Sequence, residues 1–141
     1  MFLTESDYRT QIKDTQLAQL TENQTSVRTW AEQAAMAQIK SRLAVRYDVA
    51  NIFNKTGDDR NPEIVMYMVD MVIYHLHSRA TPGQVPKTRK ERYQDALDWL
   101  NKVAQGDYAA DLPTVGDTDG DGVDDKNVVQ WGSRKPRDPY F

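Results

Sequence analysis

A run of alternating aspartates near the end of the sequence is the pattern best suited to chemistry. Residues 117–125 read Asp-Thr-Asp-Gly-Asp-Gly-Val-Asp-Asp. Calcium loops of the EF-hand type place oxygen ligands at alternate positions, a glycine at position 6 and a backbone carbonyl at position 7. This pattern predicts a calcium site whose ligands are Asp117, Asp119, Asp121, Val123 (through its carbonyl) and Asp125.

The aspartate run differs from an EF-hand at position 12, where Val128 replaces the usual bidentate glutamate. It is more similar to the shorter aspartate loops of thrombospondin-type calcium repeats, which occur in tandem, whereas one copy is present here. Two interpretations remain open: a weak, single Ca²⁺ site, or a solvated acidic turn. Ca²⁺ is the one cofactor that the sequence suggests.

The remaining reactive side chains do not form a catalytic set. The chain has no cysteine, and its two histidines, His75 and His77, are two positions apart, so a helix would point them to different faces. A zinc pair on a helix requires histidines at i and i+4. We therefore expect packed or interface histidines and a protein that is not an enzyme.

Asp70 is unusual because it interrupts a strongly apolar stretch. A buried carboxylate is costly unless a cation pairs with it. We expect a salt bridge to Arg42 or Arg46, and we consider a general base tuned by burial the less favoured alternative.

The length, composition and net charge of the chain limit the classes of function that it can have. The chain has 141 residues, of which 39% are hydrophobic and 28% are charged, as expected for one folded domain. The net charge of −3 argues against binding naked DNA through bulk electrostatics. The most apolar stretch, residues 64–76, is too short to span a bilayer, and the first residues lack signal-peptide features, so we expect a cytosolic protein or a particle assembled there.

Helix signals run through the first 108 residues. Thr4 and Asp7 form a capping box before a short helix that includes Tyr8 and Ile12. Leu17 and Leu20 mark a second short helix, and a turn over residues 48–53 is also possible. A long helix is expected from Thr25 or Ser26 to about Tyr47, because apolar residues recur there at helical spacing.

Two further helices follow. Asn61 and Pro62 suit an N-cap and a first helical position, and the helix expected from Pro62 to Arg79 is apolar nearly all round. Such a helix must lie at the centre of a bundle or be covered by another subunit. The last helix is expected over residues 86–105, with Gly106 as its C-cap.

The expected fold is therefore all-α: a small bundle of about four to five helices, one of them long, with an extended C-terminal arm. Residues 1–108 form the helical domain and residues 109–141 the arm, which carries the Asp-rich loop 117–125. Core or interface positions are predicted at Trp30, Leu43, Tyr47, Asp70, Tyr93 and Leu97. If Trp30 belongs to the core, its replacement by alanine costs about 3–5 kcal/mol.

The arm ends in a basic segment with aromatic residues, and these are the usual anchors of protein interfaces. We interpret it as a partner-docking segment that uses Trp131, Arg134, Lys135, Arg137, Tyr140 and Phe141. A disordered end or a basic arm for nucleic acid are the alternatives.

The order and spacing of these elements resemble a family of small proteins from Mu-like prophages and, more broadly, the head–tail connector proteins of tailed phages. The resemblance covers residues 2–106. It rests on Leu3-Thr4-Glu5-Ser6-Asp7-Tyr8, residues 17–21, Glu32, Ala35, Ile39, Leu43, Arg46, Tyr47, Pro62, Asp70, Tyr74, residues 91–97, Leu100, Val103 and Gly106.

The resemblance implies a virion structural subunit of the neck. Such subunits form a homo-oligomeric ring, expected to be dodecameric like the portal, that joins the portal to the tail and extends the DNA channel. The implied partners are the portal protein and a tail or second completion protein; DNA passes without sequence-specific binding, and no membrane is involved. The subunit would be assembled in the host cytoplasm. A DNA-packaging protein and a calcium-binding interaction module remain as alternatives.

Overall fold

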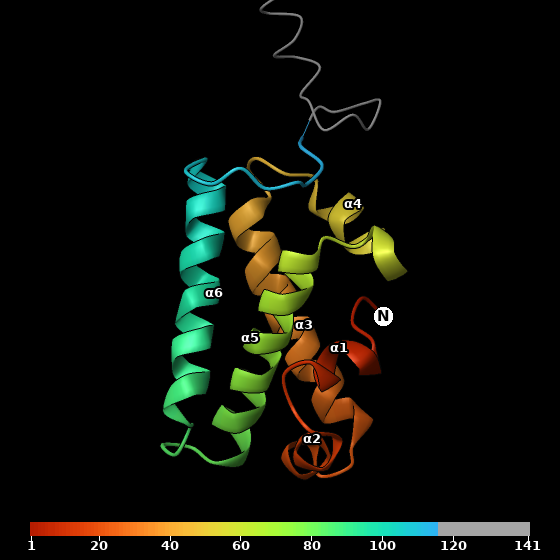
Figure 1. Cartoon of the computed structure of the whole chain (residues 1–141), viewed down its shortest axis with the longest axis vertical. Coiled ribbons are helices and arrows are strands. Elements are labelled where there is room, and N and C mark those ends of the chain that lie inside the picture. Colours follow the sequence, from red (N-terminus) through yellow and green to blue (C-terminus); the bar gives the residue numbers. More distant parts are fainter. Residues whose placement is uncertain (116–141) are drawn as a thin grey trace, which may run out of the picture.

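The computed structural model describes residues 1–115, which form a bundle of six α-helices (Figure 1). This confirms the predicted all-α fold. Three of the helices have 19 residues, where one long helix was expected. The elements are α1 (Glu5–Arg9), α2 (Asp14–Thr21), α3 (Thr25–Leu43), α4 (Val49–Asn54), the 3-10 turn η1 (Gly57–Asp59), α5 (Pro62–Ala80) and α6 (Lys87–Gln105).

Helix α5 lies at the centre of the bundle (Figure 1). It packs against α3 and α6, and the short helices α1 and α2 cover part of its remaining surface. Its fully buried apolar side chains are Ile64, Met68, Val69, Met71, Val72, Ile73 and Leu76. The apolar sequence of this helix is thus explained mainly by a central position within one chain.

The helix ends follow the capping residues expected from the sequence. The backbone N–H of Thr4 donates to the carboxylate of Asp7 (2.7 Å), which closes the capping box of α1. The side-chain oxygen of Asn61 accepts from the amides of Glu63 and Ile64 (2.9 and 3.1 Å) at the start of α5. Gly106 ends α6 with a φ of +83°, the left-handed conformation expected of a C-cap glycine.

Helix α3 ends at Leu43, four residues before the expected Tyr47. Tyr47 instead lies in extended backbone and forms an isolated antiparallel bridge with Thr114. The amide of Asp48 donates to the carbonyl of Pro113 (2.8 Å), and Leu112 is buried in the core. The first residues of the expected arm therefore pack against the helical bundle.

Among residues 1–115, no helix has both the length and the apolar character needed to cross a bilayer.

Replacing Gly106 by alanine should destabilise the bundle. The left-handed backbone at this position disfavours a side chain, and an added Cβ would meet the guanidinium of Arg46. We expect the free energy of unfolding to fall by about 1 kcal/mol, as measured by urea denaturation. The matched change Gln105→Ala, at an exposed position in the last turn of α6, should stay within about 0.5 kcal/mol. Equal stability of both variants would contradict the role given to Gly106.

Candidate functional site

A groove of about 540 Å³ lies between α5 and α6. Its apolar lining includes Met66, Tyr67, Trp99 and Tyr108, and Asp95 and Asp98 line it from α6. The rings of Tyr67 and Trp99 pack with their centroids 4.8 Å apart. Met66 is 41% exposed and Tyr108 is 45% exposed, so part of this apolar lining faces solvent. The groove therefore combines aromatic surface with carboxylates.

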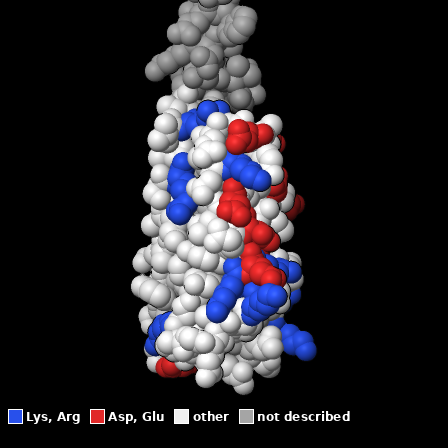
Figure 2. Space-filling view, turned by 90° about the vertical axis from the view of Figure 1, so that its left-hand side faces the viewer, with Lys and Arg blue, Asp and Glu red and all other residues white. Residues whose placement is uncertain are grey.

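The acidic residues of α6 continue beyond the groove. Glu91, Asp95 and Asp98 recur along the helix at spacings of four and three residues, so they share one side of it. Figure 2 shows acidic side chains gathered along one edge of the face that carries α6, whereas much of the opposite half of that face is uncharged. Lys and Arg side chains lie among these acidic ones, so the edge beside the groove carries charges of both signs.

Asp70 lies below the groove and is 5% exposed. Its carboxylate pairs with the guanidinium of Arg92 on α6 at 3.3 Å. Burial raises the pKa of Asp70, and the charges of Arg92 and Arg89 oppose that shift without cancelling it. The geometry supports a structural ion pair between two helices, as the sequence predicted.

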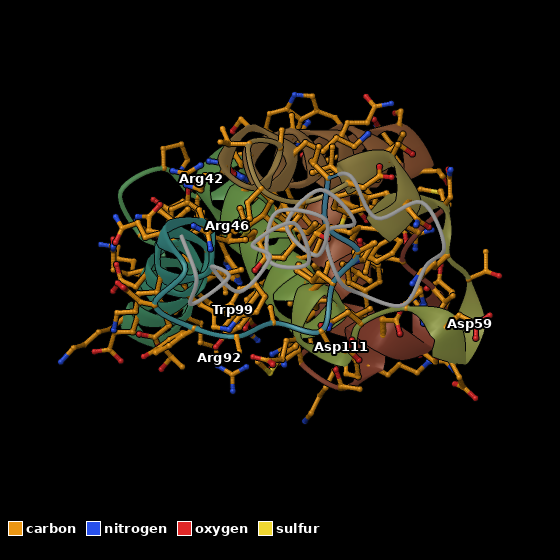
Figure 3. The ribbon with its side chains drawn as sticks, turned by 90° about the horizontal axis from the view of Figure 1, so that it is seen from above. Arg42, Arg46, Asp59, Arg92, Trp99 and Asp111 are labelled. Atoms are coloured by element: carbon orange, nitrogen blue, oxygen red, sulfur yellow. The ribbon has the colours of Figure 1, made fainter. Side chains whose placement is uncertain are left out.

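The expected partner of Asp70 was wrong. Arg42 and Arg92 lie on opposite sides of α6 when the molecule is viewed from above (Figure 3). Asp70 is on the side of α5 that faces Arg92, and Arg42 instead donates to the backbone carbonyl of Gln38 (3.4 Å). The side chain of Arg46 lies next to Gly106. Neither Arg42, near the end of α3, nor Arg46, which follows that helix, therefore pairs with the carboxylate of Asp70.

A cluster of aromatic side chains joins α3, α5 and α6; we call Trp30, Tyr74, His75 and Tyr93 the aromatic cluster. Tyr74 and Tyr93 stack with their centroids 4.0 Å apart, and Trp30 meets His75 edge-on at 6.4 Å. The amide of Gln38 donates to the hydroxyl of Tyr93 (2.9 Å), and its oxygen lies 2.8 Å from Nε2 of His75. This confirms a packed histidine at position 75.

His75 of the aromatic cluster and Met66 of the groove lie on different sides of α5, whereas Tyr74 of the cluster and Tyr67 of the groove, seven residues apart, share one side. Met66 and His75 are nine residues apart, which places them about 180° apart around a helix of 3.6 residues per turn. Trp30 is 50% exposed beside His75, and Met66 is exposed in the groove. Trp30 and Met66 therefore expose apolar surface on different sides of the central helix.

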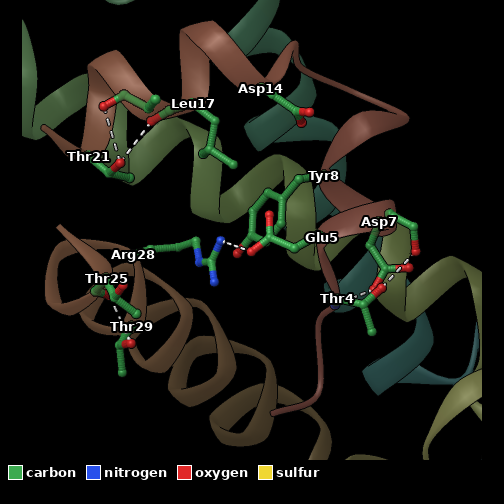
Figure 4. A network of polar contacts seen from close by, with 12 residues as sticks. Thr4, Glu5, Asp7, Tyr8, Asp14, Leu17, Thr21, Thr25, Arg28 and Thr29 are labelled. Atoms are coloured by element: carbon green, nitrogen blue, oxygen red, sulfur yellow. Dashed lines mark hydrogen bonds and ion pairs between the residues drawn. The ribbon is translucent and has the colours of Figure 1, made fainter. Parts of the chain in front are cut away.

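A buried polar network fixes α1 to α3 (Figure 4). The hydroxyl of Tyr8 donates to the carboxylate of Glu32, which is 5% exposed. Arg28 pairs with Glu5 and lies 3.6 Å from Glu32. Burial raises the pKa of Glu32, and it raises the pKa of Tyr8 together with the nearby carboxylate. The network gives a stable connection between helices and leaves no free nucleophile.

The other predicted core or interface residues fall into two groups. Leu43 and Tyr47 are buried in the core, and Tyr93 and Leu97 are half-buried against it. Trp30 is the exception: half of its surface faces solvent, so of the two predicted placements the core does not apply, and the interface stays a prediction. Its position on the side of α3 turned away from the central packing explains the difference, since Ala31 and Ala35 take the buried positions.

Two predicted sites lie outside the described residues. They are the calcium loop (Asp117, Asp119, Asp121, Val123, Asp125) and the docking segment (Trp131, Arg134, Lys135, Arg137, Tyr140, Phe141). In the part of the chain that the structure describes, no group of three or more His, Asp or Glu side chains is arranged to hold a metal ion. Both sites therefore remain predictions from the sequence.

Some residues of these surfaces were missed in the sequence. Trp99 is buried three positions after Ala96 and four before Val103, so it belongs to the helical stripe of α6 and was detectable by spacing. Met66 and Tyr67 lie in the helix that was predicted to be apolar nearly all round, and the sequence did not indicate which of its side chains are exposed. Glu32 was noted only for the family resemblance, and nothing in the sequence indicated its burial, because a charged residue on a helix is normally solvated.

Residues 1–115 define a helical-bundle protein with exposed apolar side chains, Trp30 and Met66, on different sides of its central helix. The sequence pattern of the family described as Bacteriophage Mu, Gp36 matches residues 2–126. The chain belongs to this family, which confirms the resemblance to Mu-like phage proteins, and the match extends through the Asp-rich loop. No curated protein and no solved structure is significantly similar to this chain.

Alanine substitutions should distinguish the half-exposed Trp30 from the buried Trp99. Trp99 is 7% exposed, so Trp99→Ala should lower the free energy of unfolding by about 3–5 kcal/mol. Trp30→Ala removes a half-exposed side chain and should cost less than about 1 kcal/mol. Urea denaturation of both variants measures the difference. A loss of several kcal/mol for Trp30→Ala would contradict its placement at the surface.

Acid should destabilise the bundle partly through His75. Burial lowers the pKa of His75 below its ordinary value of 6.5. The unfolded chain then binds the proton first, so the stability from the neutral imidazole is complete above about pH 6.5 and is lost as the pH falls towards the folded pKa. The slope from one proton is at most about 1.4 kcal/mol per pH unit.

The variant His75→Gln tests this effect by urea denaturation between about pH 7 and pH 5. Wild type should lose more stability over this interval than the variant. The contributions of His77, Glu32 and Asp70 are present in both proteins and cancel in the comparison. Parallel pH profiles would show that His75 is not responsible.

Proposed function

We propose that this phage protein is a structural subunit of the virion neck. Copies of it would assemble into a ring between portal and tail and extend the channel through which DNA passes. The observation that supports this proposal is a stable bundle, from a phage protein family, with exposed apolar side chains on opposite sides of its central helix. A structural role, rather than catalysis, is the function that this arrangement supports best.

Ring assembly requires two different surfaces on each subunit. In a head-to-tail contact, one surface of a subunit meets the other surface of its neighbour, and a suitable rotation closes the ring. The aromatic cluster around Trp30 and the groove around Met66 are separate surfaces of this kind. Large exposed apolar side chains are also more common at interfaces than on the surface of a monomer.

The proposed ring also has an expected copy number, expected partners and an expected place of assembly. The ring would match the portal in copy number, expected to be twelve, and would contact the portal protein on one side and a tail or completion protein on the other. The net charge of −3 suits a channel that does not hold DNA by fixed cationic clusters. Assembly in the host cytoplasm, without a membrane, fits this role.

The alternative role in DNA packaging would draw on the basic start of α6. Its four cations are Lys87, Arg89, Lys90 and Arg92. Three of them are already engaged in the fold: Arg89 donates to the backbone carbonyl of Gln11 (2.7 Å), Arg92 pairs with Asp70, and Lys87 pairs with Glu91 (3.7 Å). These contacts favour a structural explanation of the basic cluster. Calcium binding by the Asp-rich loop is a separate proposal that is compatible with the neck role.

Electron microscopy of the full chain mixed with the portal protein of the same phage tests the proposal. We expect a ring stacked on the portal. Trp30→Lys should reduce ring formation, because it places a charge on one contact surface, whereas Gln19→Lys on the exposed side of α2 should not. Absence of both a ring and a portal complex would overturn the neck assignment. Repeating the wild-type experiment with Ca²⁺ and with a chelator tests the Asp-rich loop.

A further inference from the structure

We propose that the groove between α5 and α6 binds residues 131–141 of the neighbouring subunit. This inference rests on the ring assembly proposed above and names the part of the neighbour that enters the groove. The segment reads Trp-Gly-Ser-Arg-Lys-Pro-Arg-Asp-Pro-Tyr-Phe. Aromatic residues stand at both ends, and cations stand between them.

The shape and lining of the groove suit an aromatic peptide. It has a volume of about 540 Å³ and is open to solvent along Met66 and Tyr108. The rings of Tyr67 and Trp99, tilted by 31° against each other, form an aromatic wall in which Trp99 is nearly buried and Tyr67 is half-buried. Such a wall packs against aromatic side chains and also attracts an arginine guanidinium placed over a ring. Aromatic and arginine side chains are the ones that the segment supplies.

The charges of groove and segment are complementary. Asp95 and Asp98 are exposed and line the groove from α6. The segment carries three cations, Arg134, Lys135 and Arg137, and a single aspartate. Opposite charges at the rim of an interface set its orientation and increase the rate of association.

The two cations that line the groove do not cancel this complementarity. Arg92 is paired with the buried Asp70 at 3.3 Å. The ammonium of Lys102 lies 3.2 Å from the hydroxyl of Tyr108 and over its ring, and its pKa is raised by that hydroxyl and by the charges of Asp98 and Asp107. Asp98 accepts a hydrogen bond from the side-chain amide of Gln94 (3.0 Å) through one oxygen, whereas Asp95 makes no hydrogen bond or ion pair within residues 1–115. Asp95 and the second oxygen of Asp98 are therefore the acceptors left for an incoming cation.

The chain is long enough to reach a neighbour. Fifteen residues, 116–130, separate the described part from the segment, and an extended chain of that length spans up to about 50 Å. A helix of 19 residues, such as α5, is about 28 Å long. The connection can therefore span more than the length of the central helix, which is enough for the segment to reach a groove on an adjacent subunit.

Charge reversal in the full chain tests the inference. The groove-reversed variant carries Asp95→Lys and Asp98→Lys, and the segment-reversed variant carries Arg134→Glu, Lys135→Glu and Arg137→Glu. Each variant alone should self-associate about tenfold or more weakly than wild type in sedimentation velocity, because like charges then meet in the groove. An equimolar mixture should recover association, because each segment finds a groove of opposite charge on the other variant.

Each other outcome overturns the inference in a distinguishable way. If both variants assemble as wild type does, the segment does not bind this groove, and the ring proposal stands. If association recovers only when all five changes are in one chain, and not in the mixture, the segment binds the groove of its own subunit. If wild type itself stays monomeric, alone and with the portal protein, the ring proposal and this inference fail together.

Two controls separate folding from assembly. Circular dichroism of each variant should match wild type, since Asp95 and Asp98 are exposed and do not support the core. The matched reversal Asp58→Lys with Asp59→Lys changes the net charge equally at exposed positions of η1. Asp59 lies far from Trp99 when the molecule is viewed from above (Figure 3), so this control should assemble as wild type does.

Discussion

Burial of the apolar helix α5 is the constraint on which the rest of this structure depends. Each fully buried Ile, Leu, Met or Val side chain contributes about 1.5–3 kcal/mol, so a helix that carries seven of them dominates the core. The chain covers this helix with α3, α6 and the short helices α1 and α2. The side between α1 and α6 is left partly open at Met66, where the groove begins.

The polar groups within this core act as connections between helices. Asp70 on α5 pairs with Arg92 on α6, and Glu32 on α3 accepts from Tyr8 on α1. A buried carboxylate without such a partner would cost several kcal/mol, so each pair also restricts where its two helices can lie. The position of α6, and with it the wall of the groove, is therefore set by an ion pair as well as by packing.

Local features of the fold could be predicted from the sequence, and long-range pairings could not. The caps at Thr4, Asn61 and Gly106 depend on neighbouring residues, and all three are confirmed. The partner of Asp70 depends on how helices rotate against each other, which spacing along one helix does not reveal. Tyr47 left the helical pattern because its bridge to Thr114 is made across 67 positions of the chain. Trp30 has the spacing of the apolar stripe of α3, but Ala31 and Ala35 occupy the buried positions of this helix and Trp30 is half-exposed.

The division between core and surface bears directly on assembly. The side chains that hold the bundle together are inside it, whereas Trp30 and Met66 contribute little to its interior. In the proposed ring, substitutions at these two positions would therefore change contacts between subunits without unfolding any of them. A subunit with this property can fold before it meets its partners, so ring closure would depend on collisions between finished bundles. Stability of the single chain and affinity between chains can then be adjusted separately, because different residues determine them.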